Sequence, residues 1–211
     1  MWVKSSRILD GFCNGFAILQ LKDMADQKLH FLGFSHLADD MQMVPDIDNY
    51  EVVYEQELPD DLEIPGNYLP TLLEKIYHIF NVQHPEDFKG HSLSVGDVVA
   101  LKYNGKMSYH YVDVVCFVPL LDFEKKVVQI DNRFCHLVDE FQLYDGEVIQ
   151  LGNIMDSEWD LFYYAKVQNK DYVSEYDYRP SREEMEDDYI AEMAERAIDE
   201  REAEVGAILG I

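Results

Sequence analysis

The chain has 211 residues, and its 42 acidic and 17 basic side chains give a formal net charge of −25. Such a charge repels DNA, RNA and anionic membranes, which disfavours direct binding to nucleic acid and favours a basic protein surface as the partner. No apolar run has the length of a membrane span or a signal peptide, so we expect a soluble protein of the cytoplasm.

Strand patterns come first along the chain. The short apolar run Gly15–Lys22 predicts a buried strand, and the run 28–34 (KLHFLGF) predicts a second strand within hairpin distance. Ser35 is placed to cap a short helix over 35–41. The stretch Asn49–Leu58 again has strand composition, so three strands and one short helix are expected in this part.

A helix and a hairpin follow an acidic loop. The stretch 59–70 contains prolines and a glycine and predicts the loop. Pro70 suits the first turn of a helix whose apolar residues recur at three- and four-residue spacing and which should end near Asn81. The pair Asn104-Gly105 favours a tight turn, because both positions can take positive φ. Strands are expected on either side of this turn, at 97–103 and 108–118.

The C-terminal part begins with strands and ends in a long helix. Strands are expected at 125–130 and in a hairpin around Asp145-Gly146. The stretch 156–167 predicts a short helix capped by Asp156 or Ser157, and 169–180 predicts a tyrosine-rich connector. Ser181 then opens a long helix, with Glu184 three residues later as in a capping box. The apolar residues of this helix are expected to form one stripe that docks on the protein: Met185, Tyr189, Ile190, Met193, Ala194, Ala197, Ile198 and Val205.

Together these elements predict an α+β fold. A mainly antiparallel sheet should carry packed helices and end in a long acidic C-terminal helix. The change of composition at residue 156 suggests two parts, an α+β domain over 1–155 and an acidic helical region over 156–211 that packs on it or extends from it.

The stretch Gly90–Ala100 (GHSLSVGDVVA) has the composition of a catalytic loop. However, the members of a catalytic triad must converge in space, and both the G-x-S-x-G and the phosphate-loop patterns are missing. The favoured interpretation is structural, with polar side chains bonding backbone amides in a turn before a strand. The residues assigned to this turn are Gly90, His91, Ser92, Ser94 and Asp97. A hydrolase using His91 with Ser92 or Ser94 is the alternative.

Neither a metal nor a cofactor is expected. No two of the seven histidines have H-x-x-x-H or H-E-x-x-H spacing, and the three cysteines lack the spacing of a metal site. The adjacent pair Cys135-His136 would point to opposite faces of a strand. We expect Cys116 and Cys135 to pack as small apolar residues in or near strands, which suits a reducing compartment.

An acidic row accompanies the last helix. Neighbouring carboxylates in it lie roughly 5 to 6 Å apart along the axis, at about 1.5 Å rise per residue, which is the scale of successive nucleic-acid phosphates. The row either occupies a groove built for a nucleic-acid backbone or is a solvated face. Its members are Glu184, Asp188, Glu192, Glu195, Asp199 and Glu202. Three nearby tyrosines, Tyr172, Tyr176 and Tyr178, suit a partner interface as readily as a core.

Five segments resemble the YodL-like domain family. They are FAILQLK (16–22), NYEVVYEQEL (49–58), LLEKIYHIFN (72–81), HPEDFKGHSLSVGDVVALKYNG (84–105) and YHYVDVVCFVPL (109–120). The central motif of the family reads approximately P-x-D-F-x-G-H-S-L-S-V-S-D-V-V, so the similarity over Phe16–Leu120 is fairly specific. Gly96 stands where the family usually has serine, and Cys116 stands where it usually has glycine.

The resemblance implies an accessory binding domain of bacterial mobile elements, often carried in long multi-domain proteins or beside antirestriction genes, with no established catalytic activity. It does not extend to the acidic C-terminal region, where a specialised function could have been added. We expect a non-enzymatic inhibitor of a basic host protein such as a CRISPR or restriction nuclease, acting through the acidic row. The alternative is a scaffolding module without mimicry. The oligomeric state is left open.

Overall fold

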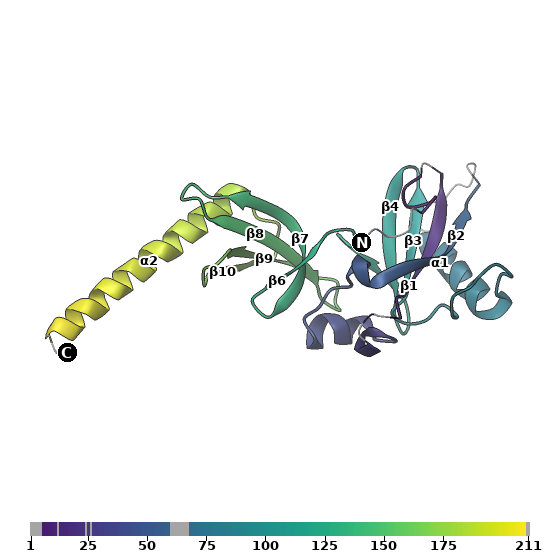
Figure 1. Cartoon of the computed structure of the whole chain (residues 1–211), viewed down its shortest axis with the longest axis horizontal. Helices are drawn as coiled ribbons and strands as arrows, with labels where there is room; N and C mark the ends of the chain where they lie inside the picture. The colour runs from purple at the N-terminus through teal and green to yellow at the C-terminus, as the bar shows by residue number, and fades with distance from the viewer. Residues whose placement is uncertain (1–5, 12, 24, 26, 60–67, 210–211) are drawn as a thin grey trace.

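The protein has an α+β fold built from two five-stranded antiparallel sheets that lie side by side, with several short helices around the first sheet and one long helix on the second (Figure 1). The computed structural model describes residues 6–11, 13–23, 25, 27–59 and 68–209. Within these residues, no helix is long and apolar enough to cross a membrane. The expected α+β class is confirmed, although two sheets take the place of one.

The first sheet has the strand order β2-β1-β3-β4-β5. Its strands are β1 (Gly15–Leu21), β2 (Tyr50–Glu57), β3 (Val98–Tyr103), β4 (Lys106–Val112) and β5 (Phe117–Leu120). All seven residues of β1 are buried, because neighbouring strands pair with both of its edges and side chains cover both of its faces. Phe16 and Ile18 face the helix α1 (Leu69–His78), whereas Ala17 and Leu19 face the opposite core.

The prediction of a strand at 28–34 is wrong. The chain there forms only the short helical turn η1 (Gln27–Leu29) and a loop, followed by the π-type turn η2 (His36–Asp40). Since β2 and β3 occupy the two edges of β1, no edge of that strand is left for the segment to pair with. Ser35 precedes η2 as expected, but its side chain makes no cap hydrogen bond.

Two local predictions are confirmed in the first lobe, which consists of the first sheet and the helices around it, whereas the second lobe consists of the second sheet and the last helix. Asn104 and Gly105 both have positive φ, 49° and 74°, in the tight turn between β3 and β4. Pro70 lies in the first turn of α1, and the helix continues into the π-type turn η4 (Ile79–Gln83), close to the expected end at Asn81. Most of the expected loop at 59–70 lies outside the described residues.

The strand expected at 108–118 is divided in two. β4 ends at Val112 and β5 begins at Phe117, because Asp113 closes a turn between them. The Asp113 amide donates to the Cys116 carbonyl (2.9 Å), and its carboxylate accepts from the Phe34 amide (2.9 Å). Cys116 is therefore exposed in a loop, contrary to the expectation that it packs in a strand, whereas Cys135 is buried as expected.

The second sheet has the strand order β10-β9-β8-β7-β6. Its strands are β6 (Val127–Ile130), β7 (Arg133–Gln142), β8 (Val148–Met155), β9 (Leu161–Val167) and β10 (Val173–Tyr176). The strand expected at 125–130 and the hairpin around Asp145-Gly146 are confirmed. Met155 of β8 belongs to the core of the first lobe, so side chains of both sheets pack together where the lobes meet.

The prediction of a short helix at 156–167 is wrong, because this stretch forms a turn followed by β9. The Asp156 carboxylate accepts from the amides of Glu158 (2.9 Å) and Asp160 (2.8 Å) and closes the turn. Hydrogen bonds from an aspartate side chain to following amides occur at the start of turns as well as of helices. The expected boundary at 155–156 thus falls between neighbouring strands of one sheet. The chain passes from the first sheet to the second between Leu120 and Val127.

The last helix, α2 (Arg182–Leu209), begins against the second sheet and then runs past its end, so that its C-terminal part projects away from both lobes (Figure 1). Met185 and Tyr189 are buried against the sheet, and Met193 packs beside them. Every side chain described from Ala194 to Ile208 is exposed.

Candidate functional site

The stretch Gly90–Ala100 is organised around two buried polar side chains. Gln20, in the middle of β1, donates through Nε2 to the Asp97 carboxylate (3.0 Å) and to the His91 carbonyl (2.9 Å) and accepts through Oε1 from the His91 amide (3.1 Å). The Asp97 carboxylate also accepts from the Ser94 amide (2.8 Å). The motif is thereby fixed to the central strand of the first sheet, which supports its structural interpretation.

Gly90 is required by a close approach within this network. A Cβ atom at this position would lie 2.3 Å from Oε1 of Gln20. Any other residue would displace the Gln20 amide and with it the bonds to His91 and Asp97. No sequence motif singles out Gln20, although a glutamine within the apolar run FAILQLK is the signal that marks it.

Burial raises the pKa of Asp97 to about 6, and the Ser94 amide, His91 and Gln20 oppose this rise. Nε2 of His91 lies 3.7 Å from the Asp97 carboxylate, and its Nδ1 lies 2.8 Å from the Ser92 carbonyl and 3.1 Å from Nε2 of Gln20. Both ring nitrogens thus face groups of the loop or the Gln20 amide that holds it. This differs from a nucleophile–base pair, in which one ring nitrogen bonds the attacking hydroxyl.

The two serine hydroxyls are also engaged locally. Ser94 Oγ donates to the Ser92 carbonyl (2.7 Å), and Ser92 Oγ lies 3.3 Å from Nε2 of His84. The structure therefore brings His91, Ser94 and Asp97 together, but in bonds that hold a turn.

The N-terminus of α2 is fixed by the expected capping box. The Glu184 carboxylate accepts from the Ser181 amide (2.7 Å), and Ser181 Oγ accepts from the Glu184 amide (3.2 Å). Arg182 makes two hydrogen bonds to the Asp139 carboxylate, at 2.6 and 2.9 Å, and lies over the ring of Phe141. These contacts set the direction in which the helix leaves the sheet.

The three tyrosines expected at an interface are mostly in the core. Tyr172 and Tyr176 are buried between the second sheet and α2, and only Tyr178 is exposed. Tyr176 donates to the Asp188 carboxylate, and Tyr178 donates to Glu184 (3.2 Å). Only Tyr178 is accessible to a partner while α2 is docked.

The acidic row is divided by these contacts into two parts. Glu184 and Asp188 serve the docked end of the helix, and Glu192 pairs with Arg196 (2.8 Å). Glu195, Asp199 and Glu202 are exposed on the projecting part. The free section of the row is therefore its C-terminal half.

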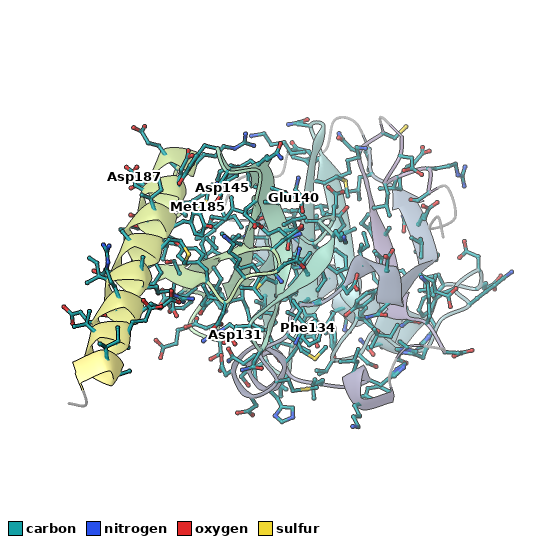
Figure 2. All side chains as sticks on the ribbon, turned by 60° about the vertical axis from the view of Figure 1, so that its left-hand side comes forward. Asp131, Phe134, Glu140, Asp145, Met185 and Asp187 are labelled. Carbon is teal, nitrogen blue, oxygen red and sulfur yellow. The ribbon has the colours of Figure 1, made fainter. Side chains whose placement is uncertain are left out.

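The apolar residues of α2 do not form one docking stripe. At about 100° per residue, Met185, Tyr189 and Met193 share one face, and Ile198 and Val205 lie nearly opposite. Figure 2 shows Met185 on the side of α2 toward the sheet and Asp187 on the outer side. Ile190, Ile198 and Val205 are 41%, 58% and 51% exposed. The expectation of one docked stripe is wrong for Ile190 and for all residues of the stripe after Met193.

An apolar groove that no sequence pattern predicted lies beside α1. It has a volume of about 530 Å³ and is lined by α1, β4, β5, the loop between these strands, and Trp159. Val114 and Val115 at its rim are 72% and 90% exposed. Its lining includes His110, whose pKa burial lowers to about 4, so the ring is neutral at pH 7. The run VDVVCFV looked like an uninterrupted strand and so concealed the exposed loop.

Metal ligands are not grouped in the described part of the chain. Among its residues, no three or more histidine, cysteine, aspartate or glutamate side chains are placed to hold a metal ion.

Comparison with known families identifies the first lobe. The model of the YodL-like domain matches residues 15–123, which span all five strands of the first sheet together with α1 and the loop held by Gln20 and Asp97. No curated protein and no solved structure was found to match. Since the family model covers more than half of the 211 residues, the chain belongs to the YodL-like domain family.

Proposed function

We propose that this protein is a non-enzymatic protein of a bacterial mobile element or phage, which acts in the cytoplasm by binding and inhibiting a host defence protein that handles nucleic acid. Inhibition of this kind is of the anti-CRISPR or antirestriction type. The observation that supports the proposal is the set of exposed carboxylates on the projecting half of α2, at Glu195, Asp199 and Glu202. The C-terminal part of α2 runs past the end of the second sheet, where a partner can approach it from several sides (Figure 1).

The mechanism is electrostatic occupation of a basic groove. α2 carries eleven acidic and three basic residues. Carboxylates spaced by one helical turn, about 5.4 Å, can meet basic side chains that otherwise contact phosphates. Attraction between opposite net charges accelerates association and makes it sensitive to salt. The protein would then compete with nucleic acid for the same groove.

The experiment is a pull-down from bacterial host lysate with and without competing DNA, followed by a cleavage assay on the captured nuclease. The test variant changes Glu192, Glu195, Asp199 and Glu202 to Gln or Asn. It leaves Glu184 and Asp188 intact, because these two acids hold the docked end of the helix. Inhibition of cleavage should fall at least about tenfold, since four charge pairs are lost.

A matched control removes the same charge from the first lobe. It changes Glu51, Glu57, Glu86 and Asp87, all exposed, to Gln or Asn. Equal inhibition by the two variants would show that total charge, rather than the acidic row, is responsible, and would refute mimicry by α2.

A second candidate function is a scaffolding module of a mobile element, in which the first lobe binds the partner. The apolar groove beside α1 favours it, because a groove of about 530 Å³ falls in the range of ligand and peptide sites. A chain that ends at Met193 separates the two functions. It keeps the packed part of α2, so a scaffold would still bind its partner, whereas a mimic acting through the projecting half would not.

A further inference from the structure

The outer face of α2 carries a seam with the spacing of a coiled coil. Residues that alternate at intervals of three and four share this face: Ala191, Ala194, Ile198, Arg201, Val205 and Ile208. The three large apolar members are 58%, 51% and 83% exposed. The sheet cannot cover them, because Met185 and Tyr189, which contact it, lie on the nearly opposite face.

From Ala194 onward, the seam belongs to the part of the helix that does not pack on the sheet. From Ala194 to Leu209 the helix extends for roughly 24 Å, at about 1.5 Å per residue. A helix of this length is only marginally stable alone in water, and burial of an apolar face is what usually stabilises it. The projecting half therefore has an exposed apolar face, and burial of that face against another helix would stabilise it.

The charges beside the seam select the partner. One flank carries Glu195 and Glu202, and the other carries Glu204. In a coiled coil these flanking positions face the flanks of the partner helix, so Lys or Arg there would form pairs between the helices. A carboxylate on the partner would suit Arg201, which lies within the seam.

A second copy of the chain is a poor occupant of this face. Two such helices would bring eleven acidic residues against eleven, with three basic residues on each side to offset them. In a parallel pair the two Arg201 side chains would also face each other within the seam. Like charges facing each other across a helix pair disfavour it, so the partner must differ from this chain.

We infer that the outer face of α2 binds a basic amphipathic helix of another protein, with Ile198, Val205 and Ile208 as the apolar anchors. This inference rests on the proposed function only for the basic nature of the partner. It adds that recognition includes an apolar seam, which a nucleic-acid backbone does not offer.

The test measures binding of the full chain to two synthetic helices by fluorescence anisotropy. The first probe has Leu at seam positions and Lys at both flanks, and its twin has Glu in place of each Lys. The first probe should bind and the twin should not. Changing both Ile198 and Val205 to Gln should weaken binding of the first probe at least about tenfold, since two buried aliphatic anchors are lost. Glutamine preserves helix propensity.

The matched control changes Val114 and Val115 to Gln, which removes two exposed apolar side chains far along the chain from the seam. It should bind the first probe as the unmodified chain does. Equal binding of both probes would overturn the inference, as would unchanged binding by the Ile198 and Val205 variant. So would a dimer, detected by sedimentation, that dissociates in that variant.

The same measurements separate this inference from the proposed function. If the first probe binds through the seam but no defence nuclease is inhibited, the proposed function fails and the inference stands. The opposite result has two parts: a nuclease is inhibited equally by the unmodified chain and by the Ile198 and Val205 variant, and the first probe binds both with equal affinity. In that case the inference fails and the proposed function stands.

Discussion

Replacing Gln20 by Leu tests whether the YodL-like motif is held by this one buried amide. Gln20 is 3% exposed, and its side chain bonds both the Asp97 carboxylate and the backbone of His91. Leucine fills the space but makes none of these bonds. A hydrogen bond to a charged group contributes about 1.5 to 3 kcal/mol, and a backbone group left without a partner costs about 1 kcal/mol more. We expect the free energy of unfolding to fall by about 3 kcal/mol.

The assay is urea and thermal unfolding followed by near-ultraviolet circular dichroism. For a chain of this size, about 3 kcal/mol corresponds to a decrease in Tm of roughly 6 to 12 °C. The control is Gln56→Leu in β2, where the side chain is exposed and the expected change is within about 0.5 kcal/mol. If Gln20→Leu lost less than about 1 kcal/mol relative to this control, the motif would not depend on the amide and the reasoning would be refuted.

Three further predictions concern Asp97 and α2. Because burial raises the pKa of folded Asp97 to about 6, above the ordinary value of 3.8, this group stabilises the fold fully below pH 4 and loses that contribution as pH rises through 6. On acidification from pH 7.5 to 5, urea unfolding should therefore show the unmodified chain gaining about 1.4 kcal/mol relative to Asp97→Asn. Met185→Ala should cost about 3 kcal/mol of α2 docking, measured by hydrogen exchange, while Ile198→Ala should not change it. Ser181→Ala should cost about 1 kcal/mol by removing the cap, seen as fraying of the first turn in the same measurement.

Each of these three predictions has a contradicting result. If the free energies of unfolding of the unmodified chain and of Asp97→Asn changed with pH in parallel, Asp97 would not be the group that titrates. Equal exchange in the Met185 and Ile198 variants would mean that the two faces of α2 are not distinct. Unchanged protection in Ser181→Ala would mean that Arg182 and Asp139 alone fix the helix start.

Features that depend only on residues close together in the chain could be predicted from the sequence. The Asn104-Gly105 turn needs positive φ at two adjacent residues, and the capping box of Ser181 and Glu184 bonds residues three apart. The first lobe could also be assigned to its family from a motif of consecutive residues. These features could be predicted because their determinants lie within a few residues of one another.

Features decided by pairing or by facing surfaces were beyond the sequence pattern. The apolar segment 28–34 had strand composition, but both edges of β1 were already occupied. The stretch 156–167 had a cap and helical composition, but β8 offered it an edge on which to pair. In both cases the pairing of strands, with β1 in the first and with β8 in the second, overrode local propensity.

The sequence by itself determined the charge, the family and the start of the long helix. Only the tertiary structure decided which face of that helix the protein covers, because a row of apolar residues in sequence does not say where the sheet ends. The tertiary structure also decided how the stretch Gly90–Ala100 is held in place. Gln20 and Asp97 are far apart in the chain and meet only when β1 and β3 pair. A burial pattern is a property of both surfaces in a contact, and the sequence of α2 describes only one of them.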